Sequence, residues 1–159
     1  MDDLERLAAE LGKALSARGL MLALAESCTG GMVAEALTTV AGSSAWFERG
    51  FVTYSNIAKI EMLDVAVETL EKFGAVSEET AREMALGALK HSHAQIACSI
   101  TGIAGPDGGT PDKPVGTVCF AWAFAEQITS TTKKLSGNRQ QIRHQSAETA
   151  LGELLKLLV

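Results

Sequence analysis

Apolar residues recur at helical spacing at the start of the chain and later gather into short continuous runs. Leu4, Leu11 and Leu15 fall on one face, so the pattern predicts an amphipathic helix over residues 2–18, which Gly19 ends. The other predicted elements are strands over 21–25, 48–55 and 95–100, a hairpin of 115–124 with 127–135, and helices over 32–40, 56–63, 68–73, 77–91 and 139–158.

Strands and helices alternate along most of the chain, and a hairpin follows. Alternation favours parallel strands with helices on both faces, whereas a hairpin adds antiparallel strands. The sequence therefore predicts an α/β fold, a three-layer α/β/α sandwich with a mixed sheet. A chain of 159 residues, 47% of them hydrophobic, suits one domain over residues 1–159.

The overall charge narrows the class of ligand. A net charge of −5 argues against a broad nucleic-acid surface, although a few local donors can still bind one phosphate group. No apolar stretch is long enough to span a membrane, and the acidic start of the chain lacks a signal pattern. We expect a cytoplasmic protein with a small-molecule substrate and neither nucleic acid nor membrane as partner. Its size and apolar content permit a homo-oligomer.

The cysteines and histidines give no pattern of a metal site or a disulfide framework. Cys28, Cys98 and Cys119 form no CxxC pair, and His91 and His93 lack the i, i+4 spacing of helical metal ligands. We therefore expect no bound metal and no cofactor.

Three loops rich in Gly, Ser and Thr follow predicted strands or helices, at residues 26–31, 41–45 and 101–109. Function in such sheets gathers in loops at strand ends, so we expect the three loops to converge at one rim. The loop 101–109 has neither the GxGxxG spacing of a dinucleotide site nor a Walker lysine. Its Gly102 and Gly105 would allow close approach of a ligand, and Thr101 at the strand end could donate to a ligand or to a developing oxyanion. The pattern alone also fits a long turn that needs its glycines.

Ser44, in the loop 41–45, is the first candidate nucleophile. A serine hydroxyl needs a base within hydrogen-bond reach, and the three histidines lie in unsuitable contexts. Lys59, in an apolar segment, can act as a base if burial lowers its pKa. Tyr54, between the two, can orient the lysine or fill the sheet. The pattern alone also fits a helix-capping Ser44 and a solvated Lys59.

The loop 26–31 offers rival chemistry. Cys28 or Ser27 before a helix would lie near the positive end of the helix dipole, which makes Cys28 an alternative nucleophile. We favour an anion-binding nest of the backbone N–H groups of Thr29, Gly30 and Gly31. On the last helix, Arg139 and Arg143 share a face and can grip a phosphate or carboxylate.

Five sequence blocks together resemble the CinA C-terminal domain family. They occur in the family's order and span nearly the whole chain, at residues 25–31, 42–56, 74–77, 99–109 and 113–118. The resemblance implies an α/β/α sandwich that hydrolyses the carboxamide of nicotinamide mononucleotide to nicotinate mononucleotide and ammonia, a step in pyridine nucleotide recycling. It also implies a serine–lysine mechanism without metal.

Carried over by position, the resemblance gives each candidate residue a role. Ser44 would be the nucleophile, Lys59 the general base and Tyr54 an assisting or binding group. Thr101 would line the reaction centre, and Arg139 or Arg143 would bind substrate.

Two positions depart from the family's pattern. Asn138 stands where an aspartate is common before the arginine, and Ile57 stands where an acidic residue is common. Two alternatives stay open: a nucleotide-binding module without turnover, and a related amidase with another substrate.

Overall fold

The computed structural model describes residues 2–159 and contains one five-stranded sheet of order β2-β1-β3-β4-β5. Strands β1 (Leu22–Glu26), β2 (Phe47–Val52) and β3 (Ile96–Gly102) run parallel. Strands β4 (Thr117–Phe124) and β5 (Gln127–Lys134) form an antiparallel hairpin beside β3. The sheet is therefore mixed, as the sequence predicts.

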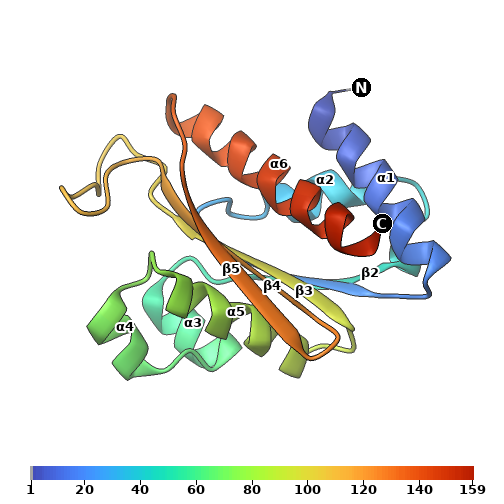
Figure 1. The fold of residues 1–159 in the computed structure, drawn as a ribbon, viewed down its shortest axis with the longest axis horizontal. Coiled ribbons are helices and arrows are strands. Elements are labelled where there is room, and N and C mark those ends of the chain that lie inside the picture. Colours follow the sequence, from blue (N-terminus) through green and yellow to red (C-terminus); the bar gives the residue numbers. More distant parts are fainter. Residues whose placement is uncertain (1) are drawn as a thin grey trace.

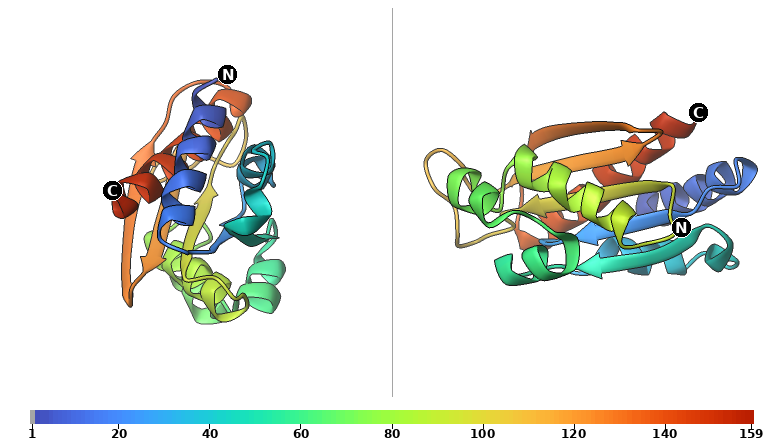
Figure 2. Two further views of the ribbon diagram at one scale, coloured as in Figure 1. Left: turned by 90° about the vertical axis from the view of Figure 1, so that its right-hand side faces the viewer. Right: turned by 90° about the horizontal axis from the view of Figure 1, so that it is seen from below.

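Helices cover both faces of the sheet (Figures 1 and 2). One layer holds α1 (Asp3–Ala17), α2 (Met32–Thr38) and α6 (Arg139–Leu158). The other holds α3 (Asn56–Leu63), α4 (Val67–Phe73) and α5 (Glu78–Lys90). The predicted α/β/α sandwich is confirmed.

The central strands are buried because helices cover both of their faces. All five residues of β1 are buried, and the first seven of β4 are too. The largest apolar cluster joins the sheet to α1, α2 and α6 around residues such as Leu11, Phe120 and Leu151. This close packing fixes the carboxyl ends of β1 and β3, and so it positions the side chains that follow these two strands.

Side chains that cap the helix ends fix where several helices begin. Ser77 caps α5 by accepting the Thr80 N–H. Ser55 caps α3 by accepting the Ala58 N–H, and Asn138 forms a capping box with Gln141 at α6. The caps at α3 and α6 fix the first turns of the helices that carry Lys59 and Arg139.

Candidate active site

Lys59 lies against Ser27 at the carboxyl ends of the parallel strands. Its Nζ is 3.0 Å from the Ser27 Oγ and donates to the carbonyl oxygen of Thr53 at 2.8 Å. A longer contact of 3.4 Å reaches the carbonyl of Tyr54. Ser27 follows β1, Thr53 follows β2, and Lys59 projects from the second turn of α3. Three separate segments thus form one serine–lysine pair.

The amine of Lys59 lies in an environment that disfavours its charge. The side chain is 1% exposed, and none of the ion pairs within residues 2–159 includes it. Burial lowers the pKa of Lys59 below the ordinary value for lysine, because desolvation penalises the ammonium form. A lysine whose pKa is lowered, in contact with a hydroxyl, is suited to act as a general base.

The structure does not bring Ser44 to Lys59. Ser44 lies exposed in a 3-10 turn (Ser43–Ala45) just before β2, and Lys59 follows β2. The parallel pairing of β1 with β2 begins at Phe47 and ends at Val52. Ser44 therefore lies at the amino ends of these strands, and Lys59 lies at their carboxyl ends. The six residues of β2 span five steps of about 3.3 Å, so the two ends of this strand lie about 16 Å apart. The expected Ser44–Lys59 pairing is therefore corrected to Ser27–Lys59.

The loops at residues 26–31 and 101–109 converge at the carboxyl ends of β1 and β3. The loop at 41–45 precedes β2 and lies at the other ends of the parallel strands. The first two line one cavity of about 260 Å³, together with residues that follow β2. Its lining includes Ser27, Cys28, Tyr54, Asn56, Lys59, Thr101, Gly102, Gly105, Asp107 and Arg139. Two of the three loops thus meet at one rim, and the expectation for the third was wrong.

Cys28 contributes a thiol to this cavity, but its ionisation is disfavoured. Burial raises the pKa of Cys28 to about 12, and the attraction of the Arg143 charge only partly opposes that rise. A protonated thiol is a poor nucleophile. Ser27 is therefore the better candidate of the two.

The backbone of residues 26–31 is tied to the chain's own groups. The Gly31 N–H donates to the Glu26 carboxylate at 3.1 Å, and the Gly30 N–H donates to the Ser27 carbonyl at 3.0 Å. These two donors are already engaged, so the backbone N–H groups of Gly30 and Gly31 do not form the predicted anion nest. Thr29 likewise donates its hydroxyl to Glu26.

Arg139 and Arg143 take different positions. Arg139 lines the cavity and donates to the Gly105 carbonyl at 2.6 Å and the Tyr54 hydroxyl at 3.1 Å. Arg143 instead donates to the carbonyls of Cys28 and Thr29 at 3.1 and 2.9 Å. Arg139 is thus the arginine placed to meet a ligand, and Arg143 braces the turn that follows Ser27.

Tyr54 and Thr101 border the cavity in different ways. Tyr54 is 62% exposed, so its ring lies at the entrance and not in the sheet core. Thr101 is buried and donates its hydroxyl to the Ala75 carbonyl at 2.8 Å. That proton is engaged, so Thr101 shapes the wall of the cavity.

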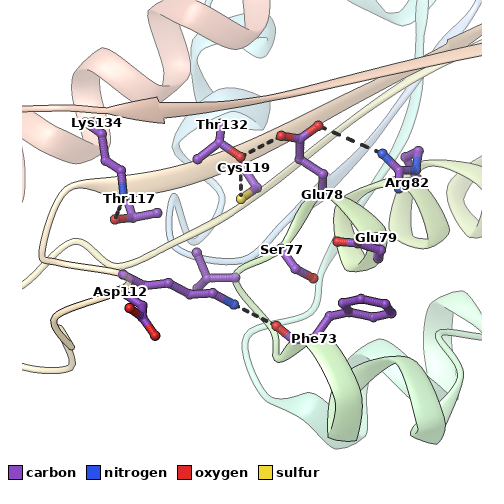
Figure 3. A pocket seen from close by; sticks show the side chains of 12 residues that line it. Phe73, Ser77, Glu78, Glu79, Arg82, Asp112, Thr117, Cys119, Thr132 and Lys134 are labelled. Atoms are coloured by element: carbon purple, nitrogen blue, oxygen red, sulfur yellow. Dashed lines mark hydrogen bonds and ion pairs between the residues drawn. The ribbon is translucent and has the colours of Figure 1, made fainter.

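A second cavity has a volume of about 500 Å³, and Val76 lines both it and the first cavity. Figure 3 shows the side chains that line this second cavity. Its polar groups contact one another: Lys113 donates to the Phe73 carbonyl, and Lys134 donates to Thr117. Glu78 accepts from Thr132 at 2.8 Å. Lys134 is exposed, unlike the buried Lys59, and the Thr117 hydroxyl that it contacts already donates to the Pro114 carbonyl at 2.6 Å. The first cavity is therefore the better candidate site.

Two other features are absent from residues 2–159: a metal-ion site and a membrane-spanning helix. No cluster of three or more His, Cys, Asp or Glu is placed to hold a metal ion. Within the same residues, no helix has the length and apolar character needed to cross a membrane.

The sequence contained one signal for the serine that contacts Lys59. The apolar run that ends at residue 25 predicts a buried strand, and the residue just past a parallel strand is a common place for catalytic groups. Which lysine it meets depends on the pairing of β1 with β2, which no local pattern specifies.

The fold and the cavity define a class of α/β/α proteins with a buried serine–lysine pair at the carboxyl ends of parallel strands. The model of the CinA C-terminal domain matches residues 4–158, and the chain belongs to this family.

Relatives and solved structures agree with that assignment. The chain is 55% identical to the nicotinamide-nucleotide amidohydrolase PncC of Escherichia coli K12, over 96% of this chain and 93% of that protein. It is 52% identical to the protein of the same name from Enterobacter agglomerans, over 96% of both chains. A crystal structure of the competence/damage inducible protein CihA from Agrobacterium tumefaciens matches with a TM-score of 0.96 and 47% identity, over 99% of this chain and 96% of that one.

Proposed function

We propose that this protein is a nicotinamide-nucleotide amidohydrolase. It would hydrolyse the carboxamide of nicotinamide mononucleotide to nicotinate mononucleotide and ammonia. The names of relatives more than 50% identical over nearly the full chain support the substrate. The single structural observation that supports the chemistry is the 3.0 Å contact between the Lys59 Nζ and the Ser27 Oγ.

The contacts of Lys59 suit it to receive a proton from Ser27. A neutral amine has two N–H bonds and one lone pair. Its two hydrogens can bind the carbonyls of Thr53 and Tyr54, which directs the lone pair toward the Ser27 hydroxyl. In the proposed reaction the Ser27 oxygen attacks the carboxamide carbon while Lys59 takes its proton.

The remaining steps use the same two groups. Lys59 returns the proton to the leaving nitrogen, ammonia departs, and an ester to Ser27 remains. Water, deprotonated by Lys59, then attacks this ester, and Ser27 recovers its proton as the nicotinate product leaves. General acid–base catalysis of this kind contributes about 10²–10⁴-fold in rate.

Arg139 is the proposed contact for the substrate phosphate. It stands at the entrance of the cavity, and its two hydrogen bonds leave further N–H groups of the guanidinium free to bind. The Tyr54 hydroxyl accepts from Arg139, and its own hydrogen can donate to the same phosphate. A phosphate held at the entrance would leave the ring and its carboxamide to reach inward toward Ser27.

The reaction would return nicotinamide mononucleotide to the pool of pyridine nucleotide precursors. Because ammonia is released irreversibly in dilute solution, the step commits the nucleotide to the nicotinate form. We propose this recycling role on the basis of the reaction alone.

Ammonia release separates the proposed nucleophile from the one that the sequence favoured. Ser27→Ala should lower the rate by at least about 10³-fold, the order expected for loss of a nucleophile. Ser44→Ala serves as the matched control, because Ser44 lies at the other ends of the parallel strands. Its rate of ammonia release should stay within about twofold of the wild-type rate. Full activity in a folded Ser27→Ala variant would refute the mechanism.

Substrate choice is tested with nicotinamide, its riboside and its mononucleotide. The proposal expects the mononucleotide to be used best. Binding of the mononucleotide by calorimetry without ammonia release would instead indicate a nucleotide-binding module, and faster turnover of another amide would indicate a different substrate.

A further inference from the structure

Glu26, the residue before Ser27, carries a carboxylate that is almost completely buried. The residue is 1% exposed, and none of the ion pairs within residues 2–159 includes it. Its Oε1 accepts from the Thr29 hydroxyl at 2.6 Å and from the N–H groups of Gly31 and Val33 at 3.1 Å each. Its Oε2 accepts from the Ala34 N–H at 3.0 Å.

These four contacts attach the end of β1 to the start of α2. A buried carboxylate without a cation is costly unless hydrogen-bond donors satisfy it, and here four donors do so. All four lie within eight residues after Glu26: Thr29 and Gly31 in the turn, and Val33 and Ala34 at the start of α2. The carboxylate therefore fixes the path of the chain through Ser27 to Gly31.

The main chain of Glu26 attaches the other partner of the pair. The Glu26 carbonyl accepts the Thr53 N–H at 2.8 Å, and the Thr53 carbonyl in turn accepts from Lys59. Glu26 thus holds the turn after Ser27 with its side chain and the acceptor of Lys59 with its backbone. Ser27 sits between these two anchor points.

We infer that Glu26 is a positioning residue, whose buried carboxylate sets the distance between the Ser27 hydroxyl and the Lys59 amine. The inference rests on the proposed function in taking Ser27 as the nucleophile. Replacing the carboxylate by an amide puts an NH₂ group against backbone N–H donors, so at least one contact is lost and the turn must shift. Misplacement of a reacting group by about 1 Å costs about 10²-fold in rate.

Glu83 provides a matched control, because it is also a carboxylate that caps a helix. It accepts from the Ala66 N–H at 2.9 Å and the Thr69 hydroxyl at 2.6 Å, at the start of α4. It lines neither the cavity nor the turn at Ser27. Glu26→Gln and Glu83→Gln make the same chemical change in two carboxylate caps, and both should lower the Tm.

Two measurements read the position of Ser27. The first is kcat and KM for ammonia release from nicotinamide mononucleotide. The second is the rate at which an alkyl fluorophosphonate labels Ser27, followed by mass spectrometry. In that reaction an Oγ–P bond forms, fluoride leaves, and Lys59 takes the hydroxyl proton. The label needs no knowledge of the natural substrate.

We expect Glu26→Gln to lower kcat and the labelling rate by about 10- to 100-fold while KM changes by less than about threefold. Glu83→Gln should leave all three unchanged, and Glu26→Asp should lie between Glu26→Gln and the wild type. Labelling of folded Glu26→Gln at the wild-type rate would overturn the inference.

Two further outcomes are informative. If Glu26→Gln does not fold, Thr29→Val removes the 2.6 Å contact alone and must lower the labelling rate for the inference to hold. If the wild type labels at Ser27 but releases no ammonia, the proposed function fails while the comparison of Glu26→Gln with Glu83→Gln still decides the positioning role.

Discussion

Arg139 and Arg143 lie one turn apart on α6, yet their guanidinium groups hold different segments. Arg139 reaches Gly105 and Tyr54 at the entrance of the cavity. Arg143 reaches the carbonyls of Cys28 and Thr29 behind the turn that carries Ser27. The helix thus presents one arginine to the cavity and one to the backbone beside Ser27.

This difference predicts different kinetic effects of the two arginines. A charge-assisted hydrogen bond contributes about 1.5–3 kcal/mol. Arg139→Ala should therefore raise KM for the mononucleotide by about 10- to 100-fold and reduce the preference over the riboside. Arg143→Ala should mainly lower kcat, because it frees the Ser27 turn. Steady-state kinetics on both substrates checks this, and an unchanged preference in Arg139→Ala would contradict the phosphate contact.

The lowered pKa of Lys59 predicts how the rate depends on pH. Only the neutral amine accepts the Ser27 proton, so kcat/KM should rise with pH and level off above the pKa of Lys59 in the folded protein. Lys59→Arg keeps the charge but does not deprotonate, so it should lose about 10²–10⁴-fold in rate at every pH. A flat profile in the wild type would argue against Lys59 as the base.

The same shift affects stability. Between the lowered pKa of the folded state and the ordinary pKa of the unfolded state, the unfolded chain binds more protons, so the free energy of unfolding should rise with pH in that window. Urea unfolding across this range checks the sign. Lys59→Met should lose this rise.

Cys28 should react slowly with alkylating reagents although it lines the cavity. With the pKa of Cys28 raised to about 12, only about one thiol in 10⁴ is ionised at pH 8. Labelling by iodoacetamide should accelerate about tenfold for each unit of pH between 8 and 10. Mass spectrometry of the native protein, with the urea-unfolded protein as reference, measures this rate. Fast native labelling at pH 7 would restore Cys28 as a candidate nucleophile.

Gly87 lets α5 approach α3 closely. A Cβ at this position would overlap the carbonyl oxygen of Leu63, the last residue of α3. Gly87→Ala should therefore lower the free energy of unfolding by about 1–3 kcal/mol. Gly152→Ala is the control, because that glycine in α6 has open space around it and alanine favours a helix by about 0.5–1 kcal/mol. Urea unfolding of both variants should show effects of opposite sign.

The amino-acid sequence by itself determined the elements and the layers. The spacing of Leu4, Leu11 and Leu15 specifies α1, and the apolar run before Glu26 specifies a buried strand. Such patterns are local, because each reports which side of one segment is buried. The caps at Ser77 and Asn138 are equally local, since donor and acceptor are three residues apart. The unsuitable histidines pointed to Lys59 as the base, and the family blocks supported that choice.

Only the tertiary structure decided which serine meets Lys59. Ser44 is 15 residues from Lys59 in the chain and Ser27 is 32, yet Ser27 is the one within 3.0 Å. Strand β2 carries the chain from the amino ends of the parallel strands to their carboxyl ends. Its parallel pairing with β1 brings Ser27 and Lys59, which are far apart in the sequence, to the same ends of the strands. The roles of Arg139 and Arg143 depend on the same non-local packing, because each is defined by the segment that it contacts across the fold. The Glu26 carboxylate contacts its own turn, and only the backbone bond from Thr53 to Glu26 joins distant segments.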